Sequence, residues 1–254
     1  MGRDFPEKHL NFLRSKGLDL ASLKVGAGNT FRWRGEYKQG DLNTALTLAT
    51  ELGVLENYVP QAAEHQRDIP NVFLANLDPD MQMKLLSTLK KPKLIGLDSM
   101  NLWINIKLPS LKRLMKKVHL FVANDAEARA LTGESNLIQA ARKLASMGPQ
   151  MIVVKKGEHG VLFYSKNTMF SFPAYPVDRV VDPTGAGDTF AGGLMGYLSK
   201  VQKVNETTLR KALLYATTLA SFNVEGFGMA KTASLTMADV EVRLKELVKF
   251  FSIT

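Results

Sequence analysis

Residues 180–193 read Val180-Val181-Asp182-Pro183-Thr184-Gly185-Ala186-Gly187-Asp188-Thr189-Phe190-Ala191-Gly192-Gly193. Two β-branched residues predict the end of a strand, and Pro183 stops that strand because it fixes φ and lacks an N–H donor. Glycines on either side of Ala186 then allow a sharp turn that a ligand can approach closely. From Thr189 onward, apolar residues recur at spacings of three and four, which predicts a helix. The stretch therefore predicts a strand, a turn and a helix that begins at the turn.

The predicted turn is suited to binding an anion. Free backbone N–H groups and the positive end of the helix dipole both favour negative charge there. Asp188 would repel a bound anion, so its carboxylate needs another task. A general base fits: it takes a proton from a hydroxyl that attacks a phosphoryl group, while Gly185, Ala186 and Gly187 hold the developing charge. The alternative is an ordinary corner in which Asp188 only complements the helix dipole.

The composition fits a globular protein, and its positive charge fits either nucleic acid or a small anionic substrate such as a phosphate. The chain has 254 residues, of which 45% are hydrophobic, and a formal net charge of +9. Its basic residues occur in scattered pairs rather than in a stripe interleaved with aromatic residues, so we expect no nucleic acid partner. Cysteine is absent, which excludes disulfides and thiolate metal sites and is typical of the reducing cytoplasm. No apolar run approaches the length of a membrane span, so we expect no membrane partner.

The middle of the chain alternates between strand and helix patterns. Continuous apolar runs predict strands at 72–75, 94–97, 119–123 and 151–154, and helices are expected near 79–90, 109–117, 125–132 and 136–147. This order predicts an α/β fold, a three-layer α/β/α sandwich with a mostly parallel sheet covered on both faces. Ligands bind beyond the carboxyl ends of such strands. Polar residues collect at those ends, among them Asp98, Asn101, Asn124, Glu127 and Lys155.

Other segments complete a single domain over residues 1–254. A first helix is expected at 6–17, a hairpin at 161–164 and 169–172, and helices near 205–223 and 236–251. Residues 30–38 alternate strictly, turn near 40–41 and are followed by a strand-like run at 44–50. This antiparallel hairpin interrupts the parallel pattern, so residues 29–50 are interpreted as a small β lid or clasp outside the main sheet. Alternatively, Arg32 and Arg34 form a solvated edge that discourages strand pairing.

The stretch at 182–193 closely resembles the second signature of the ribokinase-like (PfkB) carbohydrate kinase family. The resemblance implies a ribokinase-like fold whose β lid covers the sugar site, and ATP-dependent phosphorylation of a small sugar. It implies Asp188 as the catalytic base and the Gly185–Gly187 backbone as the anion hole. ATP and Mg²⁺ are the implied cofactors.

Two further segments resemble parts of the same family. Asn124-Asp125-Ala126-Glu127 resembles its Asn-x-x-Glu motif, which implies that Asn124 and Glu127 organise Mg²⁺-bound water and nucleotide phosphates. The alternative is a plain capping box. Residues 155–160 resemble the nucleotide-binding turn, which implies that Lys155, Gly157 and Gly160 contact the nucleotide. The alternative is a glycine-containing entry to a hairpin.

Residues 216–228 resemble the segment that flanks the adenine. This implies that small residues (Ala216, Ala220 and Ser221) let a flat base lie against a helix, and it places Thr184, Asn223 and Gly228 on the nucleotide side. The same resemblance implies a monovalent cation, K⁺, near Asp182.

The acceptor site is expected to draw residues from the main sheet and from the lid. Asp98, Asn101, Phe31 and Arg32 are the expected sugar contacts, and the aromatic face of Phe31, Trp33 and Tyr37 permits a homodimer through the lid. The family pattern begins with a strand, a substrate-binding aspartate and a Gly-Gly stretch that do not occur here. Three alternatives remain open: a sugar kinase, a kinase for a nucleoside or vitamin precursor, and an N-terminally truncated, inactive nucleotide-binding remnant.

Overall fold

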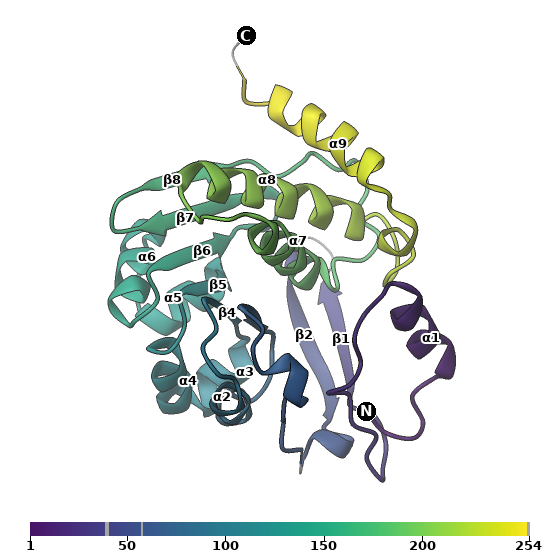
Figure 1. Cartoon of the computed structure of the whole chain (residues 1–254). Coiled ribbons are helices and arrows are strands. Elements are labelled where there is room, and N and C mark those ends of the chain that lie inside the picture. The colour runs from purple at the N-terminus through teal and green to yellow at the C-terminus, as the bar shows by residue number, and fades with distance from the viewer. Residues whose placement is uncertain (39–40, 57, 253–254) are drawn as a thin grey trace. The chain divides into compact units, whose positions relative to one another are not determined.

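The computed structural model describes residues 1–38, 41–56 and 58–252. The chain divides into two compact units (Figure 1). One unit comprises Met1–Ile69 and Asp80–Lys91, and the other comprises Pro70–Pro79 and Pro92–Thr254. None of the helices within the described ranges is long and apolar enough to cross a membrane.

The larger unit is built on a six-stranded sheet in the order β3-β4-β5-β6-β7-β8. Its strands are β3 (Asn71–Leu74), β4 (Leu94–Asp98), β5 (Leu120–Asn124), β6 (Met151–Lys155), β7 (Val161–Ser165) and β8 (Met169–Phe172). The pairings from β3 to β6 are parallel, and those from β6 to β8 are antiparallel. Apolar side chains fill the central strands on both faces, as the continuous hydrophobic runs predict.

Helices cover both faces of this sheet, which confirms the predicted three-layer sandwich. In Figure 1, α4 (Leu108–Met115), α5 (Asp125–Thr132) and α6 (Leu137–Ser146) lie on one side, and α7 (Ala186–Lys200) and α8 (Glu206–Asn223) lie on the other. The last helix, α9 (Met237–Lys249), packs on α8. Close approach of α7 and α8 requires a glycine, because a methyl group on Gly193 would lie 3.0 Å from the Cα atom of Ala216.

The smaller unit contains α1 (Glu7–Ser15), the hairpin of β1 (Arg32–Lys38) and β2 (Asp41–Glu51), and most of α2 (Pro79–Thr88). The strands pair antiparallel, which confirms the predicted hairpin; residue 40 of its predicted turn lies outside the described residues.

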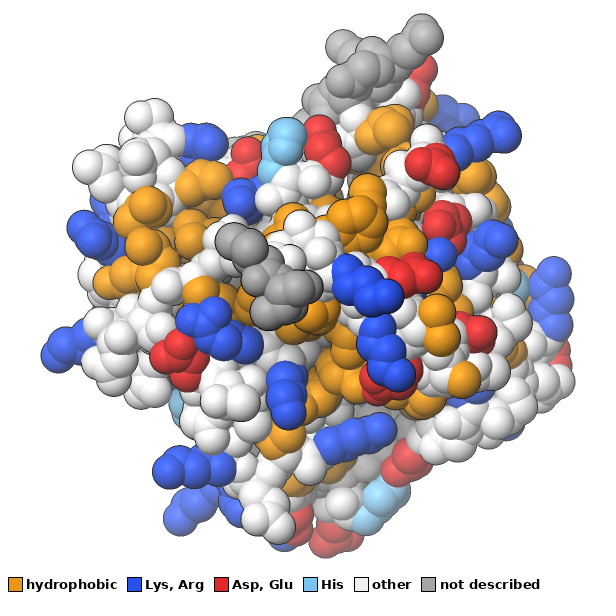
Figure 2. Space-filling view, turned by 90° about the horizontal axis from the view of Figure 1, so that it is seen from above, with side chains coloured by type: hydrophobic (Ala, Val, Ile, Leu, Met, Phe, Trp, Pro, Cys, Tyr) orange, Lys and Arg blue, Asp and Glu red, His pale blue; other side chains and the backbone are white. Residues whose placement is uncertain are grey.

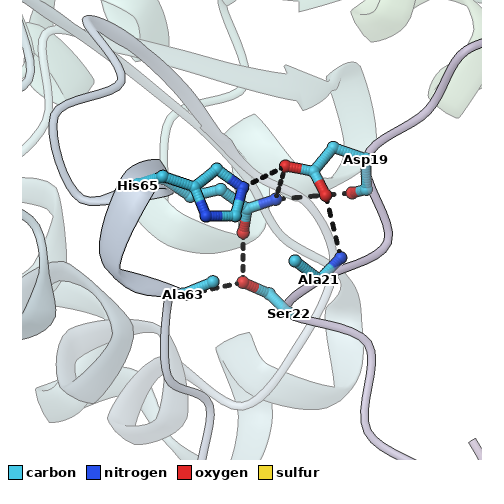
Figure 3. Close-up of polar contacts among 6 residues, drawn as sticks. Asp19, Ala21, Ser22, Ala63 and His65 are labelled. Atoms are coloured by element: carbon cyan, nitrogen blue, oxygen red, sulfur yellow. Dashed lines mark hydrogen bonds and ion pairs between the residues drawn. The ribbon is translucent and has the colours of Figure 1, made fainter.

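A polar cluster in the same unit ties two loops together (Figure 3). The Asp19 carboxylate accepts from the backbone of Ala21 at 3.0 Å, from Gln66 Nε2 at 2.7 Å and contacts His65 Nε2 at 2.6 Å. These donors lower the pKa of Asp19 to about 2. The cluster therefore holds residues 19–22 against residues 63–66.

Two details of residues 180–193 differ from the prediction. Val180 and Val181 do not end a strand: residues 173–185, all of them described, contain no strand, and Val181 is 52% exposed. Its N–H donates instead to the carbonyl of Val224 at 2.7 Å, just beyond the end of α8. The prediction was wrong because β-branched residues report a local preference, whereas a strand needs a neighbour to pair with. Helix α7 also begins at Ala186, so Asp188 lies inside its first turn.

A short helix, α3 (Asn101–Ile106), was not predicted. It follows β4 directly and leads into α4, and its six residues are too few for a helical period to stand out.

Candidate active site

Polar side chains gather where three parallel strands end. Asp98 is the last residue of β4, Asn124 of β5 and Lys155 of β6. The strands are neighbours in the sheet, and Asn124 is paired with Lys155 in the register. Parallel strands present their carboxyl ends at one edge, so the fold itself brings these residues together.

Asp98 and Lys155 form a buried ion pair. Lys155 Nζ lies 3.3 Å from Asp98 Oδ2, and the two side chains are 20% and 8% exposed, respectively. The other Asp98 oxygen accepts from the backbone N–H of Ser99 at 2.7 Å. Burial raises the pKa of Asp98, although Lys155 acts in the opposite direction. Burial alone would lower the pKa of Lys155, but Asp98 and Glu127 outweigh it and raise that pKa, so Lys155 stays charged.

Asn124 and Glu127 form the capping box that the sequence allowed. The Glu127 N–H donates to Asn124 Oδ1 at 2.7 Å, and the Asn124 N–H donates to Glu127 Oε2 at 2.8 Å. Glu127 is buried, and burial together with the charge of Asp98 raises its pKa to about 7. A capping role alone does not require a carboxylate to be buried beside another carboxylate.

This surplus of negative charge fits a cation such as Mg²⁺. Asp98, Glu127 and Asp188 all act electrostatically on Lys155, which is a single positive charge. Ser99 Oγ, buried next to Asp98, has no hydrogen-bond partner among the residues that the structure describes. Among the residues described, no group of three or more His, Asp or Glu side chains is arranged to hold a metal by itself. A magnesium ion at this place would therefore share its ligands with water and substrate phosphates, as Mg²⁺ commonly does.

The glycine turn lies at the start of α7. Gly185 has a φ of 83° and caps the helix, and the Ala186 N–H donates to the carbonyl of Pro183 at 3.1 Å. The N–H groups of Gly187 and Asp188 lie in the first turn, where a helix offers them no internal acceptor. Asp188 is exposed to solvent. A methyl group on Gly187 would lie 2.8 Å from Lys155 Nζ, so the buried ammonium reaches the first turn of α7.

Asn223 at the end of α8 holds the turn in place. Its Nδ2 atom donates to the carbonyl of Thr184 at 2.9 Å, and its Oδ1 atom accepts from Thr189 Oγ1 at 2.8 Å. The Asp182 carboxylate accepts from the N–H of Thr184 at 2.9 Å and from that of Gly228 at 3.5 Å. These bonds outweigh burial and lower the pKa of Asp182. Hydrogen bonds thus fix both sides of the predicted anion hole.

The structure gives some of the predicted nucleotide contacts a packing role. Gly160 has a φ of 85°, and a methyl group there would lie 2.0 Å from the carbonyl oxygen of Phe172, so the β7–β8 hairpin requires this glycine. Gly157 has a φ of 55° and lies in the turn between β6 and β7. Ala216 is fully buried against α7 and offers no surface to a base, whereas Ala220 is half-buried.

The expected sugar contacts divide between the two units. Phe31 and Arg32 belong to the smaller unit, where Arg32 pairs with Asp4 at 2.8 Å. Asp98 and Asn101 belong to the larger unit; Asn101 is exposed at the start of α3, whereas Asp98 is buried against Lys155. On the face shown in Figure 2, lysine and arginine side chains are scattered among acidic, polar and hydrophobic ones.

Sequence patterns gave no indication of Arg243 on α9. Its guanidinium stacks 3.5 Å from the ring centroid of Phe222, donates to Ser221 Oγ at 3.2 Å and makes two 3.0 Å bonds to Glu225. It thereby braces the segment that was predicted to flank the adenine.

A parallel-rich sandwich with an acidic residue in the first turn after a glycine loop is the arrangement that the resemblance of residues 182–193 to the ribokinase-like family implies. The chain belongs to the family described as pfkB family carbohydrate kinase, whose model matches residues 2–235.

The chain is similar to several known kinases, in sequence or in fold. A cytidine kinase from Thermococcus kodakarensis is 31% identical over 216 residues, which span 81% of this chain and 74% of that kinase. The solved structure of a Burkholderia thailandensis nucleoside kinase in complex with inosine superimposes with a TM-score of 0.76 at 19% identity, covering 98% of this chain and 80% of that one. An aminoimidazole riboside kinase from Salmonella enterica, complexed with aminoimidazole riboside and an ATP analog, has a TM-score of 0.70 at 19% identity, with 96% and 84% covered.

Proposed function

We propose that this chain transfers the terminal phosphoryl group of ATP to a hydroxyl of a small sugar, with Asp188 as the general base. The observation that carries this proposal is the position of Asp188. It is an exposed carboxylate in the first turn of α7, next to open N–H groups, and its charge acts on the buried Lys155. A base beside an anion-binding turn is the arrangement that phosphoryl transfer to a hydroxyl needs.

The chemistry follows from these groups. The acceptor hydroxyl gives its proton to Asp188 as its oxygen bonds to the terminal phosphorus. The bond from phosphorus to the bridging oxygen breaks, and ADP leaves with the electron pair. The Gly185–Gly187 turn holds the phosphoryl oxygens, where negative charge accumulates, mainly through the N–H groups of Gly187 and Asp188, because the Ala186 N–H already donates to Pro183.

Asn124 and Glu127 are the residues that would hold Mg²⁺, through water and together with the nucleotide phosphates. The bound ion would offset the charge of the phosphates. The buried, surplus negative charge around Glu127 supports this assignment. Lys155, Gly157, Gly160, Thr184, Ala220 and Gly228 remain the proposed nucleotide side of the site. Asn223 is buried and bonded to Thr184 and Thr189, so it supports that side by holding the turn. A monovalent cation beside Asp182 also remains a proposal.

A nucleoside is the second candidate acceptor. The relative that matches 81% of this chain is a cytidine kinase, and a nucleoside carries its hydroxyls on a sugar. Both candidates therefore use the same base and the same anion-binding turn, and they differ only in what surrounds the sugar.

The test is ADP formation from Mg-ATP against a panel of free sugars and nucleosides. We expect turnover that depends on the acceptor and falls at least about 100-fold in Asp188→Asn, with ATP binding retained. The rank order of acceptors decides between sugar and nucleoside. Wild-type turnover in Asp188→Asn would refute the base assignment. Binding of ATP without turnover of any acceptor would favour an inactive nucleotide-binding protein.

A further inference from the structure

Lys155 is held inside the site rather than on the surface. Its side chain is 20% exposed, and its ammonium is bonded to Asp98 at 3.3 Å. The same ammonium lies where a side chain at position 187 would project, since a methyl group there would be only 2.8 Å away. The ammonium of Lys155 therefore lies between the buried carboxylate of Asp98 and the first turn of α7.

The ammonium has donors to spare. An ammonium has three N–H donors, and the 3.3 Å bond to Asp98 uses one of them. Burial strengthens electrostatic interactions, so a charge fixed here acts strongly on an anion at the turn. The neighbouring N–H groups of Gly187 and Asp188 lie in the first turn of α7 and can donate to the same anion. Lys155 is therefore placed to act on the group that is transferred, not only on the rest of the nucleotide.

We infer that Lys155 is a catalytic residue whose ammonium contacts the transferring phosphoryl group at the Gly187 turn, and that Asp98 is a positioning residue that holds this ammonium. The inference rests on the proposed function and deepens it. Lys155 keeps its protons throughout: the hydroxyl proton goes to Asp188, the new bond joins acceptor oxygen to phosphorus, and ADP leaves with the electrons of the broken bond. Lys155 contributes more to the transition state than to bound ADP.

This inference also changes the role of Asp98. The sequence suggested a sugar contact, but both carboxylate oxygens are engaged, one by the Ser99 N–H and the other by Lys155. A buried carboxylate with these partners can fix a cation more readily than it can bind a sugar hydroxyl. Asp98→Asn keeps the size of the side chain and removes the charge that orients Lys155.

The first test measures binding, so it does not depend on turnover. The probes are Mg-ADP alone and Mg-ADP with aluminium fluoride, which imitates the transferring phosphoryl group. In Lys155→Met, we expect the gain in affinity that aluminium fluoride gives the wild type to fall by about 100-fold. Affinity for Mg-ADP alone should change by less than about threefold. Lys156→Met removes the same charge one residue along the chain and should change neither value.

Two more variants keep the test decisive if Lys155→Met folds poorly because Asp98 is left buried without a partner. The double variant Lys155→Met/Asp98→Asn removes both charges. It should lose as much of the gain in affinity from aluminium fluoride as Lys155→Met does. Asp98→Asn alone, which keeps the lysine, should lose only part of it. With the accepted substrate, kcat should fall by about 100-fold in the double variant while the KM for ATP stays within about threefold.

The outcomes separate the two proposals. If Lys155→Met and the double variant weaken Mg-ADP and the fluoride complex equally, Lys155 binds only the ground state, which overturns this inference and leaves the proposed function intact. If the wild type binds no nucleotide, the proposed function fails and this inference fails with it.

Discussion

The side-chain amide of Asn223 donates to the carbonyl oxygen of Thr184 at 2.9 Å, which ties the end of α8 to the turn that opens α7. The same side chain accepts from Thr189 Oγ1 at 2.8 Å, and it is only 4% exposed. One buried residue thus fixes both sides of the predicted anion hole, 34 residues along the chain from Thr189.

Asn223→Ala should destabilise the protein and impair the site together. Removing the amide leaves the Thr184 carbonyl and the Thr189 hydroxyl without their partner, which costs about 1–3 kcal/mol. The loosened turn should also weaken ATP binding, measured by calorimetry beside thermal unfolding. The control is Asn205→Ala at the other end of α8, where the side chain caps the helix. Loss of that cap costs about 1 kcal/mol and should leave ATP binding unchanged. Equal ATP binding in both variants would contradict this role of Asn223.

Most elements were predictable because their patterns are local. Buried strands appear in the sequence as continuous apolar runs. The first residue of a capped helix such as α5 is marked by its capping residues. For the site, the sequence predicted which residues lie at the strand ends, but it did not predict which of them contact one another. The pairing of Asp98 with Lys155 spans 57 residues, and the approach of Lys155 to Gly187 depends on how α7 packs beside β6. Such contacts follow from tertiary packing. The same packing explains why the Val181 N–H bonds to the carbonyl of Val224 and not to a neighbouring strand.

Gly187→Ala should impair catalysis without unfolding the protein. The added methyl group would lie 2.8 Å from Lys155 Nζ, the far end of a long side chain, so the ammonium is displaced and the helix stays in place. Alanine also favours a helix over glycine by about 0.5–1 kcal/mol. We expect kcat to fall by about 10-fold or more while the melting temperature stays the same or rises.

Gly192→Ala is the matched control for this prediction. Gly192 lies in the same helix, and an added methyl group there meets no described residue within 4 Å. The variant should gain helix stability and keep its turnover. A similar loss of turnover in both variants would show that the helix, and not the displacement of Lys155, is responsible.

Arg243 should contribute more to stability than the comparable Arg210. Arg243 stacks 3.5 Å from the Phe222 centroid and makes two 3.0 Å bonds to Glu225 within a half-buried setting. Arg210 lies 4.0 Å from the Phe170 centroid and pairs with Glu206 on the surface. Arg243→Met should therefore lower the free energy of unfolding by about 2 kcal/mol, and Arg210→Met by about 0.5–1 kcal/mol. Urea unfolding of both variants checks the order, and the reverse order would refute it.

Glu127 should make the stability of the metal-free protein depend on pH. Burial and the charge of Asp98 raise the pKa of Glu127 from 4.5 to about 7, so the folded state binds its proton more tightly than the unfolded state. Between these two pKa values the folded protein holds more protons, so this group makes stability fall as the pH rises from about 5 to about 7. Glu127→Gln removes the titration and can still accept the Asn124 N–H bond.

The expected result is that Glu127→Gln gains stability relative to the wild type as the pH rises through this window, by about 1–3 kcal/mol at 1.4 kcal/mol per pKa unit. Urea unfolding in EDTA without nucleotide, at several values between about pH 5 and about pH 8, measures the difference. Glu134→Gln removes a surface carboxylate paired with Lys143 and serves as the control. If the pH profiles of the wild type and Glu127→Gln run parallel, the buried Glu127 is not the group that titrates.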